Sequence, residues 1–331
     1  MLNLPFEYAL KGIVISFLCA LAVRRATDYR SYFLWIFFTI TPLVWILNSE
    51  ILSLQTGQEN FWKILEQTGF LALFNGIATG MLALLSIFAF EIFFKITTNM
   101  SLMVLCEYNH PLLERMKREA PGTFFHSQTV ATLSEDAARA IGANPLRAKA
   151  GALFHDIGKM SNPQYFTENN QHSVNQHTML TPQMSSNIIK GHVQAGLELA
   201  RQYKLGAIVQ DAIEQHHGND FVHFFYRAEL EKSQRTGEPV NQNIFRYQGR
   251  PPQTREIAII SLADACEAAS RSLTNPTQAR IEELVNKIFE QRIHDGQLRE
   301  ADITLAELEK VRESFVNSLL SMKHGRIAYQ E

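Results

Sequence analysis

Seven histidine and aspartate residues in the middle of this sequence are of the types that bind metal ions and activate water. The pair His155-Asp156 opens the string HDIGK, and His216-His217 opens the string HHG. Nearly all seven fall where a buried helix face is expected, and burying an unpaired histidine or carboxylate costs several kcal/mol. A shared metal site explains them better than seven separate partners do. The residues are His126, His155, Asp156, His192, His216, His217 and Asp264.

Apolar residues recur at helical spacing around these candidates, so helices must position them. Asn144 and Pro145 form a helix start. A row of apolar residues at helical spacing follows and ends at His155 and Asp156. We expect Gly158 to stop the helix there. The HHG pair continues two apolar rows with i, i+4 spacing, and the other three residues lie on apolar rows of their own. Five helices are therefore expected to direct ligands inward.

Seven ligands are too many for one catalytic metal ion, because such an ion keeps a position open for water. Two ions bridged by one carboxylate fit better, and Asp156 is the natural bridge because it adjoins His155. Imidazole-rich sites suit iron, zinc, copper or nickel, and carboxylate adds manganese. Two ions can hold a hydroxide between them and clamp a phosphate ester for in-line attack. The pattern predicts phosphoester hydrolysis.

Longer strings surround these residues, from about Glu91 to the C-terminus. They are NHPLLERM, APGTFFHS, IGANPLRAKAGALFHDIGKM, PQYFTENNQ, IIKGHVQAGLELA, QHHG, LADACEAASRSL and HGRIAY. In these strings the sequence resembles the HD superfamily of metal-dependent phosphohydrolases. More narrowly, it resembles the membrane-anchored, seven-transmembrane HD-domain (HDIG) phosphodiesterases that hydrolyse cyclic di-AMP to linear pApA. The resemblance implies an all-α fold with a helical HD-domain bundle, and the apolar segments of the first third add an expectation of about three transmembrane helices before it.

The resemblance also implies a division of the ligands between two divalent metal ions, iron or manganese. A hydroxide that bridges the two ions would attack one phosphorus, with the 3′ oxygen leaving. The first ion would be held by His126, His155, Asp156 and Asp264, and the second by His192, His216, His217 and the bridging Asp156.

Two cations near the motifs are candidates for contact with a phosphate. Lys159, which closes HDIGK, is a catalytic candidate beside Asp156, because it could neutralise a phosphate; the alternative is an exposed lysine that caps the helix end. Arg271 lies seven residues after Asp264 on the same helix face. It could reach a phosphate or pair with Glu267, and the sequence leaves both interpretations open.

A polar stretch at residues 227–256 holds two glycines and three prolines, and we expect a long loop there. Tyr247 and Phe245 in this stretch could stack on an adenine, or could pin the loop to the core, as loop aromatics more often do. Farther on, Thr304 and Glu307 have the spacing of a capping box and predict the start of a helix. Six other histidines keep the ordinary interpretation of residues that bind no metal: His110, His172, His177, His223, His294 and His324.

Charged residues make up 19% of the 331 residues, but they are nearly absent from three segments in the first third of the sequence. Thr68 to Phe90 is long enough to span a bilayer, which takes about 20 residues. Ser31 to Leu47 can span with its flanks, and Gly12 to Val23 can span if it extends back to Glu7. We therefore expect a transmembrane region at residues 1–97 and a cytoplasmic HD phosphohydrolase domain at residues 98–331.

The loops expected between the spans differ in charge. Residues 24–30 hold three arginines, whereas residues 48–67 hold three glutamates and one lysine. By the positive-inside rule this places everything after Phe90 in the cytoplasm, below a bacterial inner membrane. Full-length relatives carry a large extracytoplasmic domain and more spans. We expect a naturally short form or a sequence that begins partway through the usual protein.

The expected partners are a cyclic dinucleotide substrate and the lipid bilayer, and a homodimer is compatible with the sequence. Net charge −2 gives no electrostatic footprint for duplex nucleic acid. One alternative is hydrolysis of cyclic di-GMP, which the absence of a GYP string after HHG disfavours. Hydrolysis of another nucleotide is a second alternative. A third is a non-catalytic membrane receptor for the dinucleotide, which would not need seven ligands.

Overall fold

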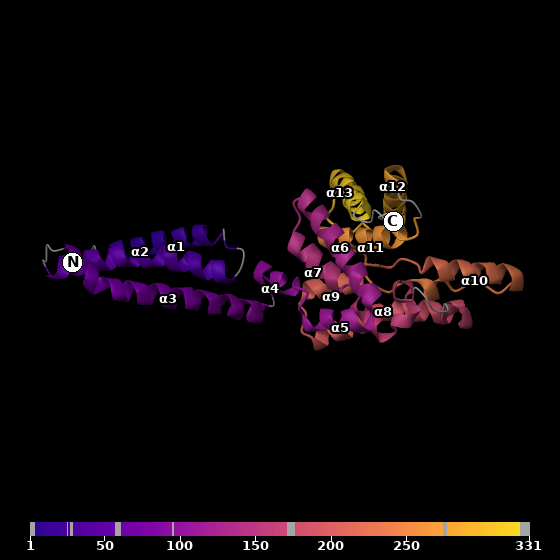
Figure 1. Cartoon of the computed structure of the whole chain (residues 1–331), viewed down its shortest axis with the longest axis horizontal. Helices are drawn as coiled ribbons and strands as arrows, with labels where there is room; N and C mark the ends of the chain where they lie inside the picture. Colours follow the sequence, from indigo (N-terminus) through magenta and orange to yellow (C-terminus); the bar gives the residue numbers. More distant parts are fainter. Residues whose placement is uncertain are drawn as a thin grey trace, which may run out of the picture. The chain divides into compact units, whose positions relative to one another are not determined.

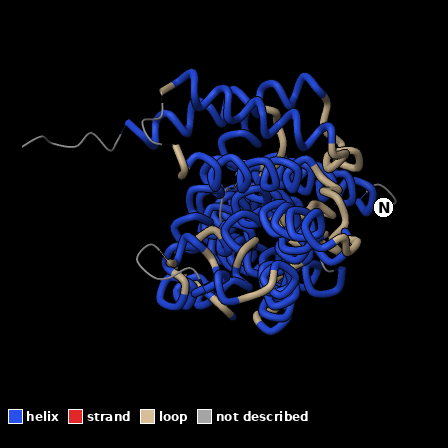
Figure 2. Tube along the Cα trace, turned by 90° about the vertical axis from the view of Figure 1, so that its right-hand side faces the viewer, coloured by secondary structure: helices blue, strands red, loops and turns tan. Residues whose placement is uncertain are grey.

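The structure is a computed structural model that describes residues 4–24, 26, 29–56, 61–94, 96–170, 176–273 and 277–324. Its described part is built of helices and loops without a β-strand (Figure 2), which confirms the predicted all-α class. The chain divides into two compact units, Met1–Met100 and Ser101–Glu331.

The first unit consists mainly of three long helices (Figure 1). Small and hydroxyl residues bring α2 and α3 close together: Oγ of Ser49 lies 3.1 Å from Oγ1 of Thr68, and Gly80 faces the ring of Phe33. By length and composition, one segment of the described residues can cross a membrane, Thr68–Phe94 within α3. The elements are α1 (Leu4–Val23), α2 (Tyr29–Thr56), α3 (Phe61–Phe94) and, at the boundary, α4 (Asn99–Leu105).

The expected loop at residues 48–67 is wrong in extent. Helix α2 continues to Thr56 and α3 begins at Phe61, so most of these residues are helical. Of the charged residues used to mark the loop, Glu50, Lys63 and Glu66 lie in α2 and α3, because charged residues such as these are good helix formers, and Glu59 lies outside the described residues.

The second unit is a bundle around one hydrophobic core. Helix starts carry the expected caps: Asn144 Oδ1 accepts hydrogen bonds from the backbone of Leu146 and Arg147, and Thr304 and Glu307 form the predicted capping box. The helices are α5 (Pro111–Glu119), α6 (Pro121–Ala140), α7 (Pro145–Phe154), α8 (Pro182–Gln202), α9 (Ala207–Gln215), α10 (His223–Thr236), α11 (Arg255–Ser270), α12 (Gln278–His294) and α13 (Leu305–His324).

Short 3-10 helices connect α7 to α8 and α10 to α11. They are η1 (Ile157–Ser161), η2 (Pro163–Tyr165), η3 (Thr167–Asn169), η4 (Gln176–Met179) and η5 (Gln242–Phe245).

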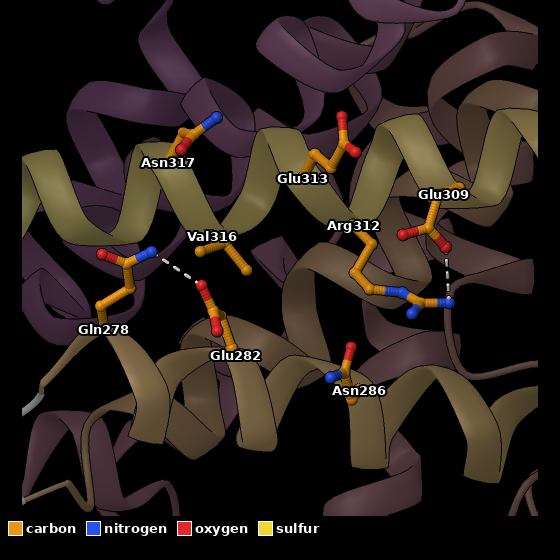
Figure 3. Close-up of a pocket in the computed structure, with 8 residues that line it drawn as sticks. All are labelled: Gln278, Glu282, Asn286, Glu309, Arg312, Glu313, Val316 and Asn317. Atoms are coloured by element: carbon orange, nitrogen blue, oxygen red, sulfur yellow. Dashed lines mark hydrogen bonds and ion pairs between the residues drawn. The ribbon is translucent and has the colours of Figure 1, made fainter.

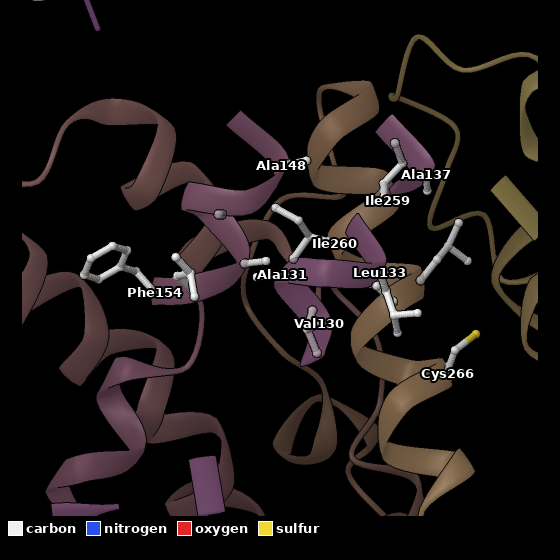
Figure 4. Packing of buried hydrophobic residues seen from close by; sticks show 14 of the residues in the cluster. Val130, Ala131, Leu133, Ala137, Ala148, Phe154, Ile259, Ile260 and Cys266 are labelled. Atoms are coloured by element: carbon white, nitrogen blue, oxygen red, sulfur yellow. The ribbon is translucent and has the colours of Figure 1, made fainter. Parts of the chain in front are cut away.

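The centre of the bundle is the packing of α6, α7 and α11 (Figure 4). Their buried faces interdigitate, so these three helices form a rigid base for the polar side chains that they carry. The residues that meet there include Val130, Leu133 and Ala137 from α6, Ala148 and Phe154 from α7, and Ile259, Ile260 and Cys266 from α11.

Candidate metal centre

Asp156 lies fully buried between four histidines. Its Oδ2 is 3.5 Å from Nε2 of His126 and 3.2 Å from Nε2 of His155. Its Oδ1 is 3.4 Å from Nε2 of His192 and 3.7 Å from Nε2 of His216. The two oxygens of one carboxylate therefore face two different groups of histidines, which is the arrangement required of a bridging ligand.

The structure brings all seven predicted ligands together in two clusters that share Asp156. Within each cluster, one potential ligand atom per residue lies within 4.8 Å of all the others. The first cluster consists of His126, His155, Asp156 and Asp264, and the second of Asp156, His192, His216 and His217.

Five helices supply these residues, as predicted. His126 lies on α6, His192 on α8 and Asp264 on α11, whereas the HD and HH pairs directly follow the last residues of α7 and α9. The 3-10 helix η1, just after α7, meets α8 closely at Gly158, where an added Cβ would lie 1.8 Å from the carbonyl oxygen of His192 and 2.5 Å from the backbone nitrogen of Gly196.

The prediction that Gly158 stops the helix by its conformation is therefore wrong. Helix α7 already ends at Phe154, and Gly158 lies inside η1 without a positive φ. What the position requires is the absence of a side chain, because the two backbones touch there. This contact brings His155 and Asp156 next to His192.

Backbone carbonyls orient three of the histidines. Nδ1 of His155 donates to the carbonyl of Ala152 at 2.7 Å, and Nδ1 of His192 donates to the carbonyl of Ile189 at 2.5 Å. Nδ1 of His216 faces two carbonyls of α9, each at 3.0 Å. In a neutral ring, donation from Nδ1 leaves Nε2 with a lone pair that points to Asp156, and this is the tautomer that a metal ligand needs.

Three atoms of the centre lack a hydrogen-bond partner among the described residues: Nε2 of His155, Oδ1 of Asp156, and Oδ2 of Asp156, which forms an ion pair with Lys159. Buried polar atoms normally have partners, so a lone pair on each of them requires an explanation. A cation between the two clusters would provide one, because each orphaned atom is a metal ligand by type. The side chains of the two clusters are therefore suited to binding divalent metal ions.

Without metal, the first cluster holds protons. Burial opposes the charge of His126, but hydrogen bonds to Asp264 and Glu267 outweigh it and raise its pKa to about 8. Burial is likewise outweighed at His155, where Asp156 and Asp264 raise the pKa to about 10. In the second cluster, burial and the neighbouring histidines lower the pKa of His216 to about 3.

These shifts predict opposite pH dependences for the stability of the metal-free and the metal-loaded protein. An unfolded histidine has a pKa near 6.5, so the stabilisation from protonated His126 and His155 is complete below that pH and is lost as the pH rises through about 8 and about 10. Metal binding needs both rings deprotonated. We expect manganese to raise Tm by a larger amount at about pH 9 than at about pH 6, as measured by thermal unfolding. An increase that is independent of pH would contradict this.

Lys159 is almost buried against the centre. Its Nζ lies 2.6 Å from Oδ2 of Asp156 and 3.0 Å from Oε1 of Glu168, and it stands over the ring of Phe166. The alternative of an exposed helix-capping lysine is therefore wrong. Although burial opposes its charge, the nearby carboxylates raise the pKa of Lys159 far above neutrality, so the side chain is a fixed cation beside the bridging carboxylate.

Glu168 was not predicted from the sequence. It belongs to η3, which packs on the start of α6: its backbone lies against Gly122, its side chain is 3.2 Å from Oγ1 of Thr123, and Oδ1 of Asn169 accepts a hydrogen bond from the backbone of Thr123. Residues 163–170 thus form a strap beside the cluster. A glutamate in a polar segment carries no periodic signal, so only the fold shows that it reaches Lys159.

Arg271 takes one of the two roles left open by the sequence. Its Nε donates to Oε1 of Glu267 at 2.9 Å, and Oε2 of Glu267 accepts a hydrogen bond from Nδ1 of His126 at 2.5 Å. Glu267, which sequence reasoning considered only as a partner of Arg271, is thus the residue behind the first histidine ligand.

Tyr247 packs on the second cluster. Its ring stacks on that of His217 with centroids 4.3 Å apart, and its side chain is almost buried. Burial and the surrounding carboxylates raise the pKa of its hydroxyl. Phe245 is fully buried against Tyr226, so it pins the segment to the core and cannot stack on a base.

The expected long loop at residues 227–256 is only partly a loop. Helix α10 continues to Thr236 and ends at Gly237, which has a φ of +76°. The residues before this glycine are good helix formers, and Gly237 supplies the left-handed cap that ends the helix. The polar composition that suggested a loop belongs to a helix exposed on most of its surface.

The remaining histidines lie outside the two clusters wherever the structure describes them. His110 caps α5, His177 contacts the carbonyl of Tyr165, and His223 contacts Asp220. His294 is exposed, and His172 and the side chain of His324 lie outside the described part of the chain.

A cavity of about 340 Å³ between α12 and α13 is separate from this centre (Figure 3). It is lined by glutamates and amides together with Arg312, which pairs with Glu309. None of the predicted ligands and substrate contacts lines it.

Comparison with known proteins agrees with this geometry. The HD-domain family model matches residues 123–269, which include all seven predicted ligands. Two solved structures of the phosphodiesterase PgpH HD domain from L. monocytogenes, one in complex with cyclic di-AMP, match 65% of this chain, each with a TM-score of 0.62 and about 40% identity, and 99–100% of those chains is covered. The chain therefore belongs to the HD-domain family, which implies binding of divalent metal ions.

Within this family the chain belongs with PgpH. It is 43% identical over 257 residues to the cyclic-di-AMP phosphodiesterase PgpH of Bacillus subtilis, which covers 78% of this chain. The chain spans 36% of the length of that relative. These findings confirm the resemblance that the strings around the ligands indicated.

Proposed function

We propose that this chain is a metal-dependent phosphodiesterase that hydrolyses cyclic di-AMP to linear pApA with two divalent ions, iron or manganese. The main observation in support of the proposal is that the two carboxylate oxygens of Asp156 face two different groups of histidines. They do so in an HD domain similar to that of PgpH. Bound ions would lower the pKa of water to about 7 and so supply a nucleophile at neutral pH.

The side chains around the clusters support hydrolysis of an anionic substrate. Oriented Nε2 atoms and the two aspartates would hold the ions. Lys159 supplies a fixed positive charge in a nearly dry position, where electrostatic stabilisation of a phosphate is strong. It cannot act as a general acid near neutrality, because its raised pKa keeps the proton on it. Tyr247 packs on His217 of the second cluster and is a candidate for contact with a substrate there.

The experiment uses the full chain in detergent, loaded with manganese or iron(II) and incubated separately with cyclic di-AMP and cyclic di-GMP. Metal-dependent conversion of cyclic di-AMP to its linear form, absent in Asp156→Asn, is the expected result by chromatography. Preference for cyclic di-GMP would contradict the proposed substrate but would agree with the proposed phosphodiester hydrolysis. Binding of either dinucleotide without cleavage in the metal-loaded protein would overturn the enzymatic function.

Lys159→Met is expected to lower kcat by about 100- to 1,000-fold, as the loss of one preorganised electrostatic contact does. The metal content should be retained, because lysine is not among the ligands. The matched control is Lys149→Met, which removes a lysine paired with Glu135 on the neighbouring helix. Elemental analysis beside steady-state kinetics makes the test: loss of metal together with activity would show that Lys159 holds the centre together instead.

The membrane anchor is also a proposal. Helices α1, α2 and α3 are each long enough to cross a bilayer, and the arginines at residues 24–30 favour a cytoplasmic position for that end and for the HD domain, residues 98–331. Protease added to sealed right-side-out bacterial vesicles should leave the HD domain intact and should degrade it in inverted vesicles. The reverse pattern would overturn this orientation.

A further inference from the structure

His126 differs from the other oriented histidines in what lies behind it. His155, His192 and His216 each direct Nδ1 at backbone carbonyls, whereas Nδ1 of His126 donates to a carboxylate oxygen of Glu267 at 2.5 Å. A carbonyl is neutral and a carboxylate carries a charge. A carboxylate behind a histidine makes Nε2 a stronger electron donor and fixes the orientation of the ring more firmly.

Both oxygens of Glu267 are used. One accepts from His126, and the other accepts from Nε of Arg271 at 2.9 Å, one turn later on α11. The side chain of Glu267 is 7% exposed, and a carboxylate so nearly buried needs partners on both sides. Arg271 itself is partly exposed, at the end of the helix. The three residues form a line that runs from the surface to the first cluster.

We infer that Glu267 and Arg271 are positioning residues that set the metal affinity of the first cluster selectively. This rests on the proposed two-metal function. Arg271 then acts through Glu267 and His126, because its Nε donates to Glu267. The second cluster has no equivalent charged support behind His192 or His216, so it should be indifferent to both residues.

The test is a manganese titration of the full chain in detergent, with free manganese followed by electron paramagnetic resonance. Glu267→Gln keeps the shape and removes the charge, and it should weaken one of two manganese sites by about 10- to 100-fold and leave the other unchanged. Arg271→Gln should weaken the same site less, and Arg271→Lys, which keeps a cation, should restore most of the affinity.

Matched controls are Glu135→Gln and Arg139→Gln, which alter a glutamate–arginine pair with the same i, i+4 spacing on α6, away from the histidines. They should change neither site. Equal weakening of both sites, or two unchanged sites in Glu267→Gln and Arg271→Gln, would overturn this inference alone. Fewer than two manganese sites in the unaltered chain would overturn the proposed function and this inference with it.

Discussion

Asp156→Asn is expected to lower phosphodiesterase activity by at least about 1,000-fold and to reduce the metal content to one ion or none per chain. The reason is geometric, because each carboxylate oxygen faces a different pair of histidines. An asparagine retains one oxygen and presents an NH2 group, a donor that cannot bind a cation, to the other pair. Elemental analysis of the purified protein and chromatography of the reaction products measure the two effects.

The control for this substitution is Asp211→Asn. Asp211 lies on α9, whose end carries the HH pair, but its side chain is 43% exposed and faces Arg250. The same chemical change there should leave metal content and activity within about twofold, as surface substitutions usually do. An Asp156→Asn protein that retains two ions would show that the two clusters do not share this residue as a bridge.

Gly158→Ala is expected to destabilise the protein by about 3 kcal/mol or more, or to prevent folding of the HD domain. The added Cβ would meet backbone atoms of His192 and Gly196 at 1.8 and 2.5 Å, and no side-chain rotation relieves a contact with backbone. The 3-10 helix η1 and helix α8 would have to separate, which would move His155 and His192 apart. Chemical denaturation measures the loss of stability.

Gly191→Ala is the matched control, one residue before His192. An added Cβ at Gly191 meets nothing within 4 Å, and its position inside α8 favours alanine by roughly 0.5–1 kcal/mol. The two substitutions add the same methyl group and should have effects of opposite sign. Equal effects would show that the close contact at Gly158 is not what limits this position.

The sequence was sufficient to predict the parts of this molecule that repeat with a helical period. The predicted ligands occur within rows of apolar residues, so these rows place the ligands on the buried face of each helix. Strings such as HDIGK indicate the family. The predicted helix starts at Asn144 and Thr304 follow from caps, which depend on neighbouring residues alone.

What the sequence could not predict depends on contacts between distant segments. Glu168 reaches Lys159 only because the strap folds back on α6, and Glu267 lies behind His126 only because α11 packs on α6. In the sequence, Gly158 looks like a residue that ends a helix. In the structure, it is the position where two backbones come into close contact. Polar residues before Gly237 look like a loop, because an exposed helix has few apolar positions to reveal its period.

The charges around the two clusters have a consequence for the order of binding. The centre and its immediate surroundings contain four carboxylates and two cationic side chains. Without metal, the raised pKa values of His126 and His155 keep both rings protonated at neutral pH, so the positive and negative charges are equal in number. Loading with two divalent ions would remove those protons and bring four positive charges, so the net charge of the centre would be +2, or +1 with a hydroxide. A cyclic dinucleotide carries two negative charges, so its attraction to this centre should arise only after the metals have bound. The charged side chains are Asp156, Asp264, Glu168, Glu267, Lys159 and Arg271.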